Sequence, residues 1–149
     1  MIWHLTMKWR AALDRELAPL GITSAQYSVL ASLYGLTRGG GRPSQRELAD
    51  FSGLEAMYVS KLVRALERAG LVERAPNPAD TRAVRLQVTE QGAQVVAAAR
   101  AKVVQLEEER LAPLGGPASP RSAALREALG VLLSHAMATP GERPPAGHH

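Results

Sequence analysis

The chain has 149 residues, of which 46% are hydrophobic and 21% charged, and it contains no cysteine. This composition is typical of an ordinary globular domain with one core, and the missing thiols exclude disulfides, thiolate zinc sites and thiol-based redox switches. The formal net charge of +4 is compatible with an anionic partner, and the basic excess lies before residue 86.

The first part of the chain predicts two helices. Apolar residues recur at three- or four-residue spacing over 2–17, and a proline and a glycine soon afterwards end this segment. Thr23 begins a second helix, with Gln26 as its capping-box partner. The run 39–43 contains three glycines and a proline and therefore predicts a loop.

Residues 44–70 predict two helices joined by a tight connection. Ser44 and Glu47 form a second capping box that begins a short helix ending near Phe51. A longer helix follows over about 55–69. Its inward and outward faces each recur at helical spacing: Val59, Leu62, Val63 and Leu66 inward, and Met57, Ser60, Lys61, Arg64 and Arg68 outward.

After Leu71 the hydrophobic period changes to that of strands. Segments 71–74 and 83–88 are short and strand-like, and Val84, Leu86 and Val88 alternate with polar residues in the second. The intervening residues 75–82 are polar and rich in proline. We expect a hairpin loop longer than a two-residue turn there.

Two further helices are predicted over 90–112, capped by Thr89, and over 120–137. Residues 139–149 are rich in proline and glycine and predict a loose tail. The expected fold is mostly α with a small β-wing. A winged helix-turn-helix lobe spans 23–92, and it is flanked by a helical region that combines 1–22 with 93–138.

This order of elements suits DNA for geometric reasons. A helix is about as wide as the major groove of B-DNA, the preceding helix sets its angle against the phosphates, and a basic hairpin can reach the minor groove. On spacing alone, the outward face of the 55–69 helix could equally be an ordinary solvated surface. The candidates for base or phosphate contacts are Ser44, Gln45, Ala56, Met57, Tyr58, Ser60 and Lys61, and the candidates for phosphate contacts are Arg64, Arg74 and Arg85.

Four segments resemble the MarR family of transcriptional regulators. They are Gln45-Arg46-Glu47-Leu48-Ala49, the run from Val59 to Arg74, Asp80-Thr81-Arg82-Ala83, and Val88-Thr89-Glu90-Gln91-Gly92. The run 59–74 followed by Asp-x-Arg is the specific part. One departure concerns Glu55, where family members more often have a Ser, Thr or Asp cap. Either Ser52 replaces that cap, or the helix begins a residue or two away.

The resemblance implies a homodimer that pairs through a helical dimerisation region, residues 1–22 and 93–138, and binds pseudo-palindromic DNA sites near promoters. It implies that Arg82 enters the minor groove, whose negative potential favours arginine, and that Asp80 helps to hold that region in place. A surface ion pair is the alternative for these two residues. It also implies release by a small aromatic effector, with candidate walls that are equally well explained as core: Trp9, Leu13, Tyr27, Leu30 and Tyr34.

Other functions have less support in the sequence. An enzyme is not expected, since there is no glycine-rich phosphate loop, nucleophile elbow or obvious acid–base pair. The four histidines have no metal-ligand spacing, so neither a metal nor a cofactor is predicted. A winged-helix module for protein–protein interaction remains the alternative, although it has no need of so many cations. With no apolar run long enough for a membrane and no signal peptide, we expect the cytoplasm.

Overall fold

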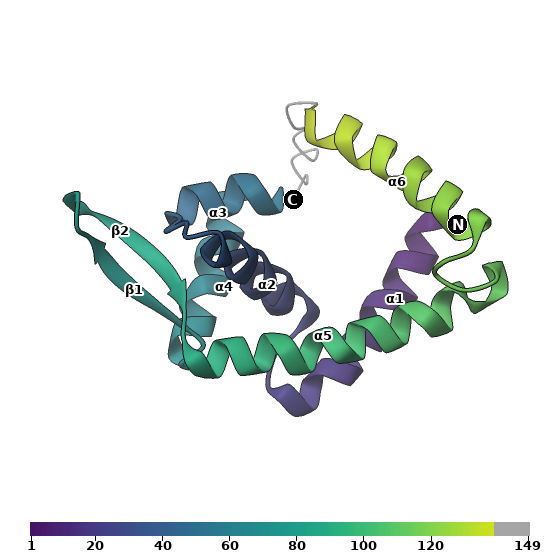
Figure 1. The fold of residues 1–149 in the computed structure, drawn as a ribbon, viewed down its shortest axis with the longest axis horizontal. Helices are drawn as coiled ribbons and strands as arrows, with labels where there is room; N and C mark the ends of the chain where they lie inside the picture. The colour runs from purple at the N-terminus through teal and green to yellow at the C-terminus, as the bar shows by residue number, and fades with distance from the viewer. Residues whose placement is uncertain (139–149) are drawn as a thin grey trace, which may run out of the picture. The chain divides into compact units, whose positions relative to one another are not determined.

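A computed structural model describes residues 1–138, although only the backbone is described at residues 81 and 83. The predicted loose tail over 139–149 lies outside the described residues. The chain divides into two compact units, the second of which begins at Glu107. The elements, shown in Figure 1, are α1 (Ile2–Leu17), η1 (Ala18–Leu20), α2 (Ser24–Arg38), α3 (Gln45–Ser52), α4 (Ala56–Arg68), β1 (Val72–Asn77), β2 (Asp80–Val88), α5 (Glu90–Leu111), η2 (Ala112–Leu114) and α6 (Pro120–Ala138).

The first unit is built around three helices and a hairpin. Helix α2 packs against α3, α4 and β2, and the β1–β2 hairpin projects from this helical cluster (Figure 1). The core between these elements is aliphatic, which agrees with the low aromatic content of the chain. The four inward residues predicted on α4 are all buried, as expected from their spacing: Val59, Leu62, Val63 and Leu66.

Both predicted capping boxes are present. The Gln26 amide donates to the Thr23 hydroxyl at 3.2 Å, and the Thr23 amide donates to the Gln26 side chain at 2.9 Å. The same reciprocal pair joins Ser44 and Glu47 at the start of α3. These bonds satisfy amides that a helix leaves unpaired at its N-terminus, which explains why both helices begin where the sequence predicts.

The N-terminus of α4 has no side-chain cap. Glu55 occupies the N-cap position without a side-chain hydrogen bond to the helix. Ser52 does not replace it, because its hydroxyl donates to the carbonyl of Ala49 at 3.1 Å. Of the two explanations offered for the unusual cap, replacement by Ser52 is therefore wrong, and α4 begins at Ala56.

The prediction of a long hairpin loop is also wrong. Strands β1 and β2 pair antiparallel and leave only residues 78–79 between them. Pro76 is tolerated in β1 because each strand of a two-stranded ribbon is an edge strand, with one side free of ladder bonds. The register is irregular after Pro76, since Pro76 pairs with Val84 whereas Asn77 pairs with Asp80. The ribbon therefore extends further than the polar, proline-rich composition suggested.

Helix α5 is joined tightly to the base of the hairpin. The Thr89 hydroxyl accepts from the Gly92 amide at 3.0 Å, which confirms the predicted cap, and it donates to the Gly70 carbonyl at 2.7 Å. The Thr89 amide donates to the Leu71 carbonyl at 3.1 Å. Helices α5 and α6 match the predicted segments to within about a residue at each end. No helix among residues 1–138 is long and apolar enough to cross a membrane.

Candidate nucleic-acid interface

The outer face of α4 is open to solvent at its N-terminal end. The Met57 side chain is 78% exposed and Tyr58 is 38% exposed, although both are large hydrophobic residues. Ala56 and Lys61 are exposed beside them. Because the opposite face carries the buried stripe, α4 is firmly seated in the core while presenting this surface outward. Such a helix can enter a groove without losing its packing.

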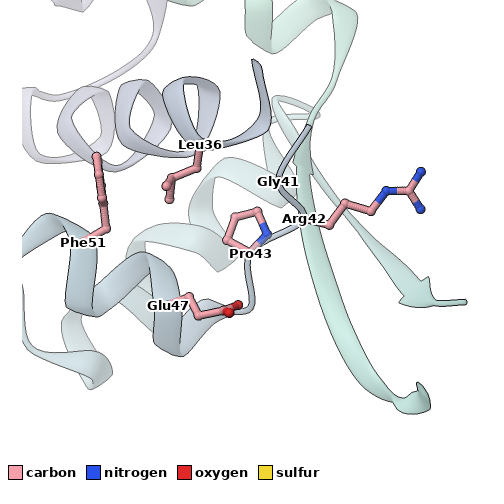
Figure 2. A pocket seen from close by; sticks show the side chains of 6 residues that line it. All are labelled: Leu36, Gly41, Arg42, Pro43, Glu47 and Phe51. Carbon is pink, nitrogen blue, oxygen red and sulfur yellow. The ribbon is translucent and has the colours of Figure 1, made fainter. Parts of the chain in front are cut away.

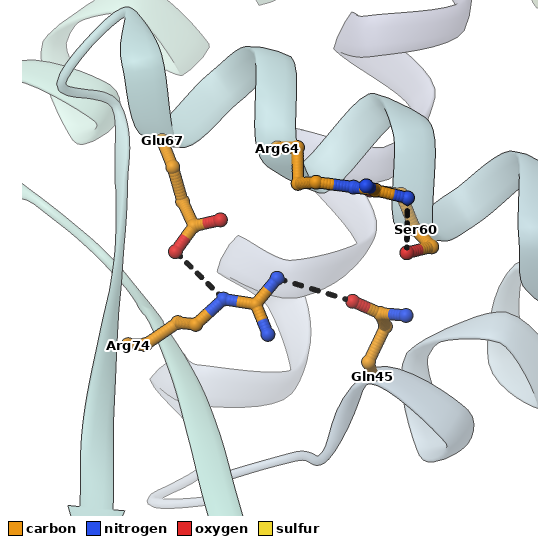
Figure 3. A network of polar contacts seen from close by, with 5 residues as sticks. All are labelled: Gln45, Ser60, Arg64, Glu67 and Arg74. Atoms are coloured by element: carbon orange, nitrogen blue, oxygen red, sulfur yellow. Dashed lines mark hydrogen bonds and ion pairs between the residues drawn. The ribbon is translucent and has the colours of Figure 1, made fainter.

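Arg64 is folded back along α4 in this structure. Its Nη2 donates to the Ser60 hydroxyl at 3.2 Å, and its Nε donates to the Ser60 carbonyl at 3.4 Å (Figure 3). The two residues lie one turn apart, and both had been predicted on the outward face. The Ser60 hydroxyl is therefore already hydrogen-bonded to Arg64, and the two side chains lie together on the outward face of α4.

The wing carries Arg82 near its tip. The side chain of Arg82 is exposed, and its amide donates to the Asp80 carboxylate at 3.0 Å. A second bond of the same kind joins the Ala79 amide to the Asn77 side chain at 3.1 Å. Side-chain bonds to an amide two residues further on shape tight turns. The carboxylate of Asp80 thus shapes the backbone that carries Arg82.

The two arginines at the base of the wing are engaged by the helices. Arg74 forms an ion pair with Glu67 of α4 at 2.7 Å and also donates to the Gln45 side chain at 3.4 Å (Figure 3). Arg85 forms an ion pair with Glu47 of α3 at 2.8 Å. Both had been predicted only as possible phosphate contacts. Their charges are compensated in the protein itself, whereas no contact among the described side chains engages the Arg82 guanidinium.

Glu47 is the most connected carboxylate of this surface. The Ser44 amide donates to its Oε2 at 2.6 Å, and Arg85 donates to the same oxygen at 2.8 Å. The bond from the Ser44 backbone, assisted by the Ser44 hydroxyl and Arg85, lowers the pKa of the Glu47 carboxyl. A charged Glu47 is therefore favoured at the junction of α3 and the wing.

Two exposed arginines of this region were missed in the sequence. Arg42 precedes α3 and Arg46 lies in its first turn, and both side chains are exposed. Figure 2 shows Arg42 directed away from the hollow of about 280 Å³ beside Leu36 and Phe51. Their place around the start of the helix-turn-helix was the available signal, because the first helix of that motif crosses the DNA backbone.

The candidate effector walls contribute to the core of the first unit. Leu30 is fully buried, and Leu13, Tyr27 and Tyr34 are half-buried against the same cluster. Burial raises the pKa of the Tyr27 hydroxyl. Trp9 is half-buried. A hollow of about 330 Å³ lies elsewhere, and its lining includes Arg10, Asp14, Tyr58, Lys61 and Arg68 from α1 and α4.

A short helix, a tight connection, an exposed second helix and a two-stranded wing define a winged helix-turn-helix protein. Residues 22–84 match the model of the MarR family. The HTH-type transcriptional regulator YdcH of Bacillus subtilis (strain 168) is 35% identical over 108 residues, which are 72% of this chain and 74% of the relative. The chain belongs to the MarR family of transcriptional regulators, and it is accordingly a regulator rather than an enzyme.

Solved structures agree with this assignment. A mutant of MarR from E. coli complexed with operator DNA is 28% identical, with a TM-score of 0.72 and 89% of each chain covered. CouR from Rhodococcus jostii RHA1, bound to p-coumaroyl-CoA, is 26% identical, with a TM-score of 0.74 over 95% of this chain and 92% of CouR. The MepR–DNA complex of S. aureus, at 24% identity and a TM-score of 0.77 over 90% and 94% of the two chains, shows the same fold.

Proposed function

We propose that this chain represses transcription as a homodimer bound to a pseudo-palindromic operator. Helix α4 of each protomer would lie in a major groove, and the β1–β2 wing would place Arg82 in the neighbouring minor groove. The observation that carries this proposal is the pairing, in one compact unit, of an exposed helix face with an exposed arginine on a projecting hairpin. Because the partner is operator DNA, we place the protein in the cytoplasm.

The proposed contacts fall into three groups. Base edges face the N-terminal half of α4, phosphates face the start of α3 and the cations along α4, and the minor groove faces the wing. Arg74 and Arg85 lie between these groups, and their remaining guanidinium N–H groups can reach phosphates. The full set is Ser44, Gln45, Ala56, Met57, Tyr58, Ser60, Lys61, Arg64, Arg74, Arg85 and Arg82, with Asp80 holding the wing turn.

Dimerisation is supported by apolar side chains that each unit leaves exposed. Helix α1 exposes Ile2, Trp3, Leu5 and Met7, and α6 exposes Leu129, Val131, Leu132, Leu133 and Met137. Exposed apolar surface of this extent is typical of an interface. A two-fold dimer would bury it and would present two α4 helices to two half-sites.

A small-molecule effector is the remaining part of the proposal. The sequence pointed to a site walled by Trp9, Leu13, Tyr27, Leu30 and Tyr34. The hollow beside α4 that includes Arg10 and Lys61 is a ready alternative. Its three cations, Arg10, Lys61 and Arg68, outnumber the one carboxylate, Asp14, and so favour an anionic compound, and a ligand there would compete with DNA for Lys61. Titration with aromatic carboxylates, read as release of bound duplex, tests this part separately.

The experiment begins by selecting duplexes from genomic fragments with the parent protein. Affinity for the selected duplex is then measured by fluorescence anisotropy over about 50–200 mM salt. Arg82→Ala should weaken binding by about 1–3 kcal/mol for each half-site, which is roughly 5- to 150-fold per protomer. Lys61→Ala should weaken binding and lower the salt slope of the bound dimer by about 1.8, which is about 0.9 for each protomer. Arg121→Ala, which removes the same charge from the start of α6, is the matched control and should change little.

Parent-like affinity of the Arg82→Ala variant would refute the assignment of the wing. An unchanged salt slope for Lys61→Ala would remove that residue from the phosphate contacts. Repression itself is tested by placing the selected duplex upstream of a reporter gene, where the parent protein should lower transcription and Arg82→Ala should not.

A further inference from the structure

The wing is attached to the start of α3 at three points. The Leu86 amide donates to the Pro43 carbonyl at 2.9 Å. Arg85 pairs with Glu47, and Arg74 donates to Gln45, as Figure 3 shows for the second bond. All three acceptors lie within residues 43–47, so the first turn of α3 and the two residues before it hold both strands of the wing.

One carboxylate oxygen of Glu47 accepts two of the hydrogen bonds in this region. Oε2 of Glu47 accepts from the Ser44 amide at 2.6 Å, which fixes the start of α3, and from Arg85 at 2.8 Å, which holds β2. The geometry of the helix start and the direction of the strand are therefore coupled through a single side chain. The capping box leaves Glu47 little freedom to follow the strand if it tilts.

The negative charge of Glu47 is unfavourable for DNA binding. Glu47 is 60% exposed at its side chain and lies beside the proposed DNA surface, where a negative charge repels phosphates. Exposed ion pairs contribute little to folding stability. A carboxylate at this position therefore weakens DNA binding unless the geometry that it maintains compensates for the repulsion.

We propose that Glu47 is a positioning residue of the DNA interface, which holds the wing through Arg85 and thereby places Arg82. This inference rests on the proposed function, because it needs Arg82 to contact DNA. Arg82 lies four residues beyond Leu86, about 13 Å along an extended strand, so a tilt of roughly 15° at the base would move it by about 3 Å. That displacement is as large as a hydrogen-bond distance.

The test compares two neutralised carboxylates of the same helix. Glu47→Gln keeps an acceptor for the Ser44 amide, since capping boxes use either residue, but it loses the charge that holds Arg85. Asp50→Asn removes the same charge from an exposed position of α3, and no described contact joins Asp50 to the wing. If charge alone mattered, both variants would bind the selected duplex more tightly. We expect Glu47→Gln to bind about threefold more weakly and Asp50→Asn to bind equally or more tightly.

A double-mutant cycle with Arg82→Ala shows whether Glu47 acts through the wing. Effects of coupled residues are not additive. In the Arg82→Ala background, Glu47→Gln should no longer weaken binding, because the side chain that it places is gone. Thermal melting of each variant, with parent-like curves expected, separates this effect from unfolding.

The outcomes distinguish the two hypotheses. If Arg82→Ala leaves binding unchanged, the proposed wing contact fails and the inference fails with it. If Arg82→Ala weakens binding but Glu47→Gln is neutral, tightens binding or adds fully to Arg82→Ala, the proposed function stands and the positioning role of Glu47 is refuted.

Discussion

Gly92, in the first turn of α5, offers a test in which two physical effects have opposite signs. Replacing a helical glycine with alanine normally stabilises a protein by up to about 1 kcal/mol. At Gly92, however, an added Cβ would lie 2.1 Å from the Leu71 carbonyl oxygen and 2.7 Å from Cγ1 of Val88. The first of these contacts is to backbone, so no side-chain rotation relieves it.

The size of the effect follows from what must move. Leu71 and Gly92 are buried, and Leu71 immediately precedes β1. Restoring an ordinary contact would require a displacement on the order of 1 Å in a packed junction, and such overpacking costs about 1–3 kcal/mol or more. After the gain in helix propensity is deducted, the free energy of unfolding of Gly92→Ala should still be about 2 kcal/mol lower than that of the parent. For a chain of this length the melting temperature would fall by about 6 °C.

Gly35 in α2 is the matched control. It is exposed, and an added Cβ there meets nothing within 4 Å. Gly35→Ala should therefore raise the free energy of unfolding, measured by urea denaturation, by about 0.5–1 kcal/mol. If Gly92→Ala were as stable as the parent, the close approach of α5 to the base of the wing would be refuted.

Three further predictions concern different parts of the chain. The pKa of Asp14 is lowered mainly by the Ser24 amide, which donates to it at 2.6 Å. Its contribution to stability is therefore present above about pH 4 and lost as the pH falls. Urea unfolding of Asp14→Asn should show a flatter acid limb, and a parent-like limb would contradict this role. If Met57 touches a thymine methyl group, replacing thymine with deoxyuracil at that position should weaken binding by the parent but not by Met57→Ala. Sedimentation should show a dimer at micromolar protein and a shift towards monomer for Leu132→Glu, since Leu132 is an exposed apolar residue of α6; an unchanged dimer would remove it from the interface.

The helices could be predicted from the sequence because their determinants are local. The capping boxes at Thr23 and Ser44 join residues only three apart, and the buried stripe of α4 repeats within one element. The wing tip was mispredicted because proline and polar residues are typical of loops. In an isolated ribbon, the free edge of each strand tolerates a proline such as Pro76 that a central strand would reject.

The connections of the candidate site depend on tertiary structure. Arg85 meets Glu47 across 38 positions and Arg74 meets Gln45 across 29 positions. A single sequence shows these residues as separate charges and amides, with no indication that they are partners. The role of the aromatic candidates was ambiguous for a related reason. Tyr27 and Tyr34 lie on the same face of a helix, and their spacing is the same whether that face lines a ligand site or packs into the core.

We propose that α4 and the wing read operator DNA together, in two half-sites. The most direct measurement is a hydroxyl-radical footprint of the parent protein and of Arg82→Ala on the selected duplex. We predict two protected half-sites about one helical turn apart, with deoxyribose protection in the flanking minor grooves that disappears in Arg82→Ala while protection of the backbone next to the α4 site persists. A single unbroken footprint that is identical for the two proteins would contradict the claim.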